Sequence, residues 1–509
     1  MTAGRVDEVT VSGGRIRGYA DGGFRRWTGV PYAAPPVGPL RWRRPQPVQA
    51  WIGVRECRQP APAAMQSVEG AHSVPVSEDC LYLNITAPDR PAPRKGWPVL
   101  VWIHGGGNTS GAASDIDDGS AFAGHGIVVV QIAYRLGAFG FLNLADTVDG
   151  REVDAGSAGL LDQIAAVRWV RRNAAAFAAD PTRITVYGES AGAKAVAALL
   201  GSPAAAGCFT GAISSSGGDS VASPAAAGAV ARSFLAGLPG CRDAAALRTL
   251  PASAILEAQH QVCPADRAVW VWRPTLHPTA LPTRPIEAIR AGSAAGVRTL
   301  VGSNGDEAVL FAQLSGESHC LDPFERVMAA VLGVPGESEA GAALEHLIAT
   351  YMSSRGLDRT AAMVAIMGDE RYAMPTLRLA EAQARWAPVY RYRLDAAPPN
   401  YPEVLAGGHT CDLPMAWQTA EMRRANPEAV ARHRVAALFH SALVAFVLRG
   451  DPNTAELPDW PVFEIPRRAT MIFGFGCEVC DDPRGTERME WPTWDWEYGT
   501  WWPLPARSG

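Results

Sequence analysis

The stretch "RITVYGESAGAKAVAALL", from Arg183 to Leu200, constrains the fold more than any other part of the chain. A β-branched apolar run ends in Gly-Glu-Ser-Ala-Gly and continues as an alanine-rich segment, which predicts a strand, a sharp turn and a helix in direct succession. Gly188 and Gly192 leave room for the turn. Ser190, between them, is then either a tight-turn residue or a nucleophile whose hydroxyl is pushed out above the end of the strand.

Other segments repeat this alternation of strand and helix. Apolar β-branched runs that end in a loop predict buried strands, and apolar residues at helical spacing predict helices between them. The order strand, strand, helix, strand, helix is typical of an α/β protein, with a mostly parallel twisted sheet and helices on both faces. Active sites of such sheets lie at the carboxyl ends of the strands. Strands are expected within 98–107, 126–141, 183–187, 296–311 and 388–397, and helices within 158–177 and 428–450.

Composition and charge limit the classes of protein that the chain can represent. It has 509 residues, of which 48% are hydrophobic and 19% charged, as in a globular protein, and its net charge of −5 argues against a nucleic-acid partner. No linker or repeat divides it, so a single domain over residues 1–509 is expected. Without a visible signal segment or bilayer-length apolar run, we expect a cytoplasmic protein with no membrane span. Monomer and dimer both stay open.

The cysteines do not indicate a metal centre. The chain has 9 of them, and they lack paired metal-ligand spacing. "CEVC", at Cys477 to Cys480, is a lone CxxC motif, which is more often structural or free than a metal site. We therefore expect neither a metal ion nor a cofactor.

A second glycine-rich motif supplies what a serine nucleophile needs. A serine hydroxyl requires a base to accept its proton, and the tetrahedral intermediate requires donors directed at its oxyanion. "HGGG", from His104 to Gly107, follows a predicted strand. The amides of Gly106 and Gly107, together with that of Ala191 after the serine, are predicted to form an oxyanion hole.

With these motifs in place, the chain resembles the type B carboxylesterases, a family of α/β-hydrolases. The resemblance covers nearly the whole chain, and "SEDCLYLN" together with "GESAG" makes it specific. It implies the α/β-hydrolase fold and hydrolysis of small carboxylic esters through an acyl-enzyme. The matching stretches include "SEDCLYLNI" (77–85), "VWIHGGG" (101–107), "YRLGAFGFL" (134–142), "DPTRITVYGESAG" (180–192), "SNGDEAVLF" (303–311) and "GGHTCDLPMAW" (407–417).

The resemblance also assigns the other catalytic roles. It implies a triad of Ser190 as nucleophile, His409 as base and Glu307, rather than the adjacent Asp306, as the acid that orients the histidine. This chain order is that of α/β-hydrolases. Buried polar support is implied at Glu189, Ser216 and Asp412. Cys57 and Cys80 match the family's N-terminal disulfide, although a cytoplasmic location would keep them reduced.

The chain departs from the family pattern at two positions near the serine. Asn108 follows the glycine run where an apolar or aromatic residue is usual, which predicts a more polar pocket. Lys194 lies one helical turn after Ser190, and we expect it on the helix surface with its ammonium in solvent. The tryptophan-rich tail, 490–505, is expected to cap an apolar surface, with lining of the substrate entrance or a dimer contact as the alternative readings.

Two alternatives to ester hydrolysis remain open. An amidase or a carbamate hydrolase would use the same triad. A non-catalytic binding relative of the fold would lack the serine or the base, and both are present here.

Overall fold

The computed structural model describes residues 6–67, 74–145, 154–238, 240–241, 243–262, 271–315, 321, 324–333, 337–424 and 428–498. Its centre is a 13-stranded sheet in the order β1-β2-β3-β7-β9-β8-β10-β11-β12-β13-β14-β15, with β4 beside β2. The strands are β1 Val6–Val11, β2 Gly14–Asp21, β3 Phe24–Pro31, β4 Val54–Glu56, β7 Tyr82–Pro88, β8 Trp97–Ile103, β9 Val128–Ile132, β10 Ala179–Glu189, β11 Gly211–Ser215, β12 Arg298–Asn304, β13 Val389–Leu394, β14 Ala469–Phe473 and β15 Glu478–Asp481. A separate pair comprises β5 Ala63–Ala64 and β6 Val76–Ser77.

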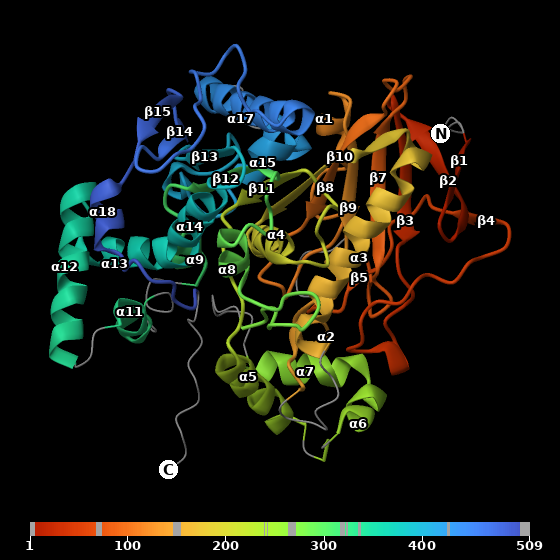
Figure 1. Ribbon diagram of the computed structural model, residues 1–509, viewed down its shortest axis with the longest axis horizontal. Coiled ribbons are helices and arrows are strands. Elements are labelled where there is room, and N and C mark those ends of the chain that lie inside the picture. The colour runs from red at the N-terminus through yellow and green to blue at the C-terminus, as the bar shows by residue number, and fades with distance from the viewer. Residues whose placement is uncertain are drawn as a thin grey trace.

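The middle of the large sheet is parallel and its two edges are antiparallel. Every pairing from β9 through β8, β10, β11, β12 and β13 to β14 is parallel. β1, β2, β3 and β7 form the antiparallel edge on one side, and β15 forms it on the other. Figure 1 shows these two edges at opposite sides of the molecule. The mostly parallel α/β sheet predicted from the sequence is thereby confirmed.

Both faces of the central strands are buried, which explains their unbroken apolar sequences. In β8, Val99, Val101 and Ile103 join one core cluster, while Leu100 and Trp102 join the other. Successive side chains of a strand point to opposite faces, so a sheet covered on both sides needs apolar residues at every position. The first cluster also contains residues of α3 and α4, and the second contains residues of α15 and α17.

The helices cover these two faces and extend the molecule beyond them. In Figure 1, α5, α6 and α7 gather at the bottom, while α11, α12, α13 and α18 lie at the left. The helices are α1 Ser120–Ala123, α2 Gly137–Phe141, α3 Ala158–Asn173, α4 Ala191–Gly201, α5 Pro224–Ala236, α6 Ala244–Thr249, α7 Ala252–Val262, α8 Pro285–Arg290, α9 Val309–Ser315, α11 Phe324–Leu332, α12 Glu337–Arg355, α13 Arg359–Gly368, α14 Met374–Gln383, α15 Asp412–Trp417, α16 Ala420–Arg423, α17 Val430–Arg449 and α18 Gly485–Glu490. A π-helical turn, η4 Asp369–Ala373, joins α13 to α14.

One described helix, α17, is long and apolar enough to cross a membrane. Its most apolar window is 61% buried inside the protein. The buried residues include Phe439, Leu443 and Phe446, which belong to the same core cluster as Trp102 of β8. The apolar composition of α17 is therefore accounted for by packing against the sheet, and it is weak support for a membrane span.

Candidate active site

Ser190 lies at the turn between β10 and α4, as the sequence predicts. Its backbone has φ 55° and ψ −121°, a conformation that is uncommon for residues other than glycine. A Cβ atom at Gly188 would lie 2.2 Å from the backbone of Gly192, and one at Gly192 would lie 2.0 Å from the carbonyl oxygen of Ile103. The two glycines thus allow the strand and the helix to approach closely. The backbone N–H of Ser190 donates to Ser215 O at 2.9 Å, which fixes the turn to the neighbouring strand β11.

A continuous chain of hydrogen-bonded side chains connects Ser190, His409 and Glu307. Ser190 Oγ is 2.8 Å from His409 Nε2, and His409 Nδ1 is 2.6 Å from Glu307 Oε2. All three residues are buried, with exposed fractions of 7%, 4% and 2% in that order. They follow three different parallel strands, β10, β12 and β13, so the carboxyl edge of the sheet brings them together.

The structure separates Glu307 from the adjacent carboxylate. The Asp306 side chain is 51% exposed and faces Arg355, whose guanidinium lies 3.4 Å away. Glu307 points inward instead. Its second oxygen, Oε1, accepts from Ser216 Oγ at 2.6 Å and from the backbone N–H of Asn304 at 2.7 Å. Of the two neighbours, only Glu307 contacts the imidazole and is fixed by further donors.

Asp412 lies beside this chain at the start of α15. Its carboxylate accepts from Tyr392 OH at 3.3 Å and from Asn304 Nδ2 at 3.5 Å. Burial, and after it the negative charge of Glu307, raises the pKa of Asp412 to about 6. Ser216 and Asp412 therefore both surround Glu307, in the positions that the resemblance implies for buried support.

Glu189 approaches the histidine from the opposite side. Its Oε1 is 3.4 Å from His409 Nε2, and the side chain is almost fully buried. Burial raises the pKa of Glu189 well above its usual range, and the charges of Asp412 and Glu307 raise it further. Burial thus shifts Glu189 toward its uncharged form.

We expect Glu189→Gln to keep the fold and to change kcat/KM for an ester by no more than about tenfold, because burial favours the uncharged form of Glu189 and an amide has the same shape and no charge. Steady-state kinetics at neutral pH, with thermal unfolding beside them, measure this. Glu307→Gln is the matched control, since it makes the same chemical change at a carboxylate that contacts His409 directly. A loss as large in Glu189→Gln as in that control would show that an ionised Glu189 is required.

The glycine run after β8 presents free amides beside the serine. Gly106 and Gly107 have φ values of 90° and 61°, which favour glycine. A Cβ atom at Gly106 would lie 2.2 Å from Ser110 O. Among the described residues, the amides of Gly106, Gly107 and Ala191 have no hydrogen-bond acceptor. Three donors without an acceptor, from the two glycine motifs, are what an oxyanion hole requires.

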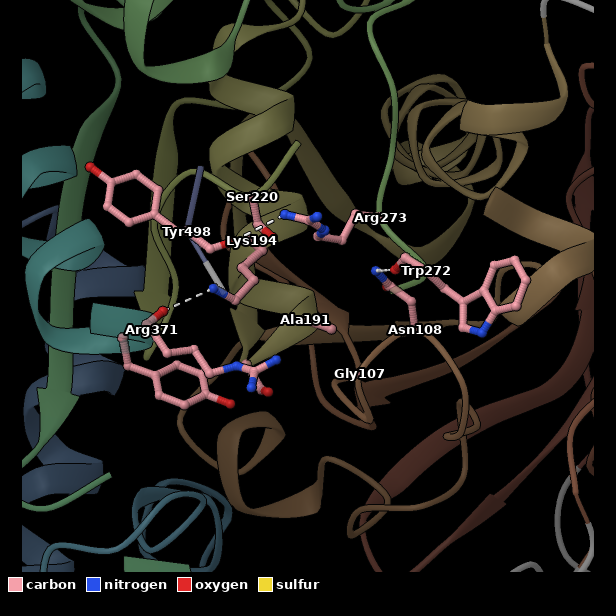
Figure 2. A pocket seen from close by; sticks show the side chains of 11 residues that line it. Gly107, Asn108, Ala191, Lys194, Ser220, Trp272, Arg273, Arg371 and Tyr498 are labelled. Carbon is pink, nitrogen blue, oxygen red and sulfur yellow. Dashed lines mark hydrogen bonds between the residues drawn. The ribbon is translucent and has the colours of Figure 1, made fainter. Parts of the chain in front are cut away.

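A pocket opens over Ser190, and Figure 2 shows the side chains that line it. Asn108 is among them, and its Nδ2 donates to Trp272 O at 2.8 Å. Tyr372 stacks on His409 with ring centroids 4.2 Å apart. Sequence reasoning missed Tyr372 and the other lining residues outside the two glycine motifs, because no motif marks the segments that carry them. These are Ser220, Trp272, Arg273 and Arg371, whereas Tyr498 belongs to the tail for which a place at the substrate entrance was an alternative.

Lys194 also lines this pocket, which contradicts its predicted place on the helix surface. Its Nζ donates to Arg371 O at 3.1 Å and to Gly217 O at 3.5 Å. Burial and the nearby charge of Arg371 lower the pKa of Lys194 to about 7. The composition of α4 carried a signal, since Lys194 is its only residue with a charged side chain and a helix that is apolar all round is usually buried all round.

The C-terminal segment runs back to the pocket. Trp491 and Trp496 are buried and stacked, with ring centroids 5.4 Å apart, which agrees with the expected apolar cap. Three ion pairs hold the segment: Arg378 and Arg290 both pair with Asp495, the former at 3.0 Å, and Arg273 pairs with Glu497 at 2.9 Å. Tyr498 lines the pocket itself, so the segment both covers an apolar surface and contributes to the pocket wall. The tail beyond 498 lies outside the described residues.

The described cysteines are unbonded. Cys57 and Cys80, which match the family's disulfide, are both buried free thiols. Burial raises the pKa of Cys57 to about 11. Cys477 and Cys480 are likewise free and only partly exposed. The CxxC motif therefore forms no disulfide in this structure.

Comparisons with known proteins agree with this architecture. The model of the carboxylesterase family matches residues 5–490. The para-nitrobenzyl esterase of Bacillus subtilis (strain 168) is 34% identical over 498 residues, which is 95% of this chain and 98% of the relative. The fumonisin B1 esterase of Sphingopyxis macrogoltabida is 33% identical over 485 residues, 92% of this chain and 86% of the relative.

Solved structures of esterases are also similar to this protein. The carboxylesterase EST55 of Geobacillus stearothermophilus superposes with a TM-score of 0.82 at 37% identity, covering 95% of this chain and 100% of that one. A PNB esterase structure superposes with a TM-score of 0.83 at 32% identity, covering 95% and 99%. Sequence and structure together show that the chain belongs to the carboxylesterase family and is a carboxylic ester hydrolase with the α/β-hydrolase fold.

Proposed function

We propose that Ser190 is the nucleophile of this esterase and that it forms an acyl-enzyme with a small carboxylic ester. His409 accepts the Ser190 proton through Nε2 as Oγ attacks the carbonyl carbon. It then donates that proton to the departing alcohol. Water, deprotonated by the same imidazole, attacks the acyl-enzyme, releases the acid and restores the serine hydroxyl.

Glu307 has the role of the orienting acid in this proposal. Its contact of 2.6 Å with Nδ1 keeps that nitrogen as the hydrogen-bond donor, so Nε2 is left to accept from Ser190. Its negative charge also stabilises the imidazolium that forms when the serine attacks. The Ser216 hydroxyl and the Asn304 backbone amide hold the carboxylate in place.

The oxyanion hole is proposed at the amides of Gly106, Gly107 and Ala191. Negative charge develops on the carbonyl oxygen when the tetrahedral intermediate forms, and fixed donors stabilise it without reorganisation. The lack of any other acceptor for these amides among the described residues supports the assignment.

The observation that carries the mechanism is the unbroken contact from Ser190 Oγ through His409 to Glu307. A partitioning experiment tests the acyl-enzyme. Two esters with the same acyl group and different alcohols are hydrolysed in the presence of methanol, and the ratio of methyl ester to free acid is measured for each. A shared acyl-enzyme gives the same ratio for both substrates. Unequal ratios would mean that water attacks the esters directly.

A substrate panel defines the breadth of the activity. We expect turnover of p-nitrophenyl esters, measured across increasing acyl length, with much lower turnover of an anilide and a carbamate of the same acyl size. Higher kcat/KM for the anilide or the carbamate would reassign the protein to the corresponding class of hydrolase.

We also propose a cytoplasmic location. The free, buried thiols of Cys57 and Cys80 support it, because disulfides persist mainly in oxidising compartments. Thiol titration of the denatured protein, isolated under alkylating conditions, tests this: recovery of a disulfide between the two would count against a reducing compartment.

A further inference from the structure

We infer that the substrate of this esterase carries a carboxylate, which Lys194 binds beside the proposed nucleophile. The inference rests on the proposed function of Ser190 and extends it to the class of ester that the pocket accepts. It concerns either arm of the ester, since an anionic group on the acyl side or on the alcohol side would present the same chemistry to the ammonium.

The position of Lys194 places a cation next to the reaction centre. Ser190 precedes α4, and Lys194 lies four residues further along, where its amide donates to Ser190 O at 3.0 Å. One helical turn advances about 5.4 Å, so the two side chains line the same pocket about one turn apart. Figure 2 shows the Lys194 side chain extending toward Arg371 within this pocket.

The charge of Lys194 has no counter-ion among the described residues. Its two hydrogen bonds go to backbone carbonyls, and it forms no ion pair in that part of the chain. The two carboxylates whose charges raise the pKa of Lys194 have other partners: Asp219 pairs with Arg284, and Glu370 accepts from Trp496 Nε1 at 3.0 Å. Burial of a charge without a partner is unfavourable, as the lowered pKa of Lys194 reflects, and a bound anion removes that cost.

The rest of the pocket reinforces the preference for an anion. Arg273 and Arg371 also line it, whereas none of its lining residues is acidic. Both arginines are buried, with exposed fractions of 8% and 3%. Arg273 pairs with Glu497 through one nitrogen, but its buried Nε has no acceptor among the described residues. A neutral aliphatic ester offers no charge to Lys194 and none to the buried Nε of Arg273.

One negative charge suits the site better than two. Lys194 has no carboxylate partner among the described residues, so one carboxylate balances its charge, while a phosphate dianion would bring a second negative charge. Because both side chains line one pocket, we take a short linker of two to four carbon atoms between the scissile carbonyl and the carboxylate. Half-esters of short dicarboxylic acids have this form.

Two series of esters test the inference. The acyl-side series comprises the monoethyl esters of succinic, glutaric and adipic acids, each paired with its neutral diethyl ester. The alcohol-side series comprises the acetate esters of 3-hydroxypropanoic and 4-hydroxybutanoic acids, each paired with its neutral amide. Proton release is followed at constant pH and constant ionic strength, because salt screens the attraction. In one series we expect kcat/KM of the acid to exceed that of its neutral partner by about tenfold or more.

Three variants connect any preference to Lys194. Lys194→Met should lower the acid-to-neutral ratio of kcat/KM by about 10- to 100-fold, mainly through KM, since a charged hydrogen bond is lost. Lys194→Arg should restore much of that ratio. The matched control is Lys95→Met, because Lys95 is the only other lysine in the chain and is exposed.

The outcomes separate this inference from the proposed function. Preference for the neutral partner throughout both series, in wild-type protein whose turnover depends on Ser190, overturns the carboxylate site and leaves the nucleophile standing. An acid preference that Lys194→Met leaves unchanged also overturns it. Turnover that survives Ser190→Ala contradicts the proposed function itself.

Discussion

Replacing Ser190 with alanine is expected to reduce kcat for ester hydrolysis by about six orders of magnitude, as removal of a triad serine does elsewhere. The Ser190 hydroxyl is the only group of the proposed triad that bonds to the acyl carbon, and it lies 2.8 Å from the base that activates it. Neither His409 nor the amides of the oxyanion hole can replace it. The fold should survive, because alanine fits wherever serine does and the Ser190 amide keeps its contact with Ser215.

Two measurements check this expectation. The first is turnover of an activated ester, and the second is covalent labelling by an organophosphonate, read by intact-protein mass spectrometry. Wild-type chain should take up one label per active site, and Ser190→Ala should take up none. Ser353→Ala, which changes an exposed serine of α12, serves as the control and should label fully. Full labelling of Ser190→Ala would place the nucleophile elsewhere.

Glu307→Gln is expected to lower kcat by about 10⁴-fold, by analogy with other triads in which the acid becomes an amide. The glutamine can turn its amide NH₂ toward Nδ1, which then accepts instead of donating and leaves the proton on Nε2. That nitrogen can no longer accept from Ser190. The negative charge that stabilises the imidazolium is lost as well.

Asp306→Asn is the matched comparison, because it makes the same change at the neighbouring position. Asp306 faces Arg355 at the surface, so its loss should reduce kcat far less. Kinetics of both purified variants on one activated ester, with circular dichroism to confirm folding, decide between the two carboxylates. A larger loss in Asp306→Asn would transfer the orienting role to Asp306. Near-wild-type activity in both would place the acid outside this loop.

The features predicted best from the sequence are those that depend only on residues close together in the chain. The turn at Ser190 depends on Gly188 and Gly192, which lie within two residues of it, and the strands on either side depend on their own apolar runs. Glu307 and His409 required the resemblance to a family. Each sits on an irregular loop after its strand, and nothing local distinguishes His409 from the other histidines of the chain.

The walls of the pocket could not be predicted in this way. Tyr372 and Arg371 come from a π-helical turn between two helices, far along the chain from Ser190. Arg273 precedes a segment without regular structure. Periodicity identifies which side of a helix is apolar, but it does not identify which distant segment covers that side. The burial of Lys194 was missed for this reason.

The antiparallel edge was missed for a different reason. β1 to β3 contain charged residues such as Arg15, Arg17 and Arg25, which pair with Glu8, Glu56 and Asp7 at the surface. Their pattern lacks the continuous apolar character of the parallel strands, because edge strands have one face in solvent. In these strands, charged residues that form ion pairs within the edge occupy positions where the parallel strands have apolar residues.

The segment from Trp491 to Tyr498 lies beyond the region that the family model matches, which ends at residue 490. A chain that stopped there would keep Ser190, Glu307 and His409, yet it would lose the side chain of Tyr498 from the pocket and the carboxylates that hold Arg273 and Arg378. Selection acting on this short stretch can therefore reshape which molecules enter while the reacting groups stay untouched.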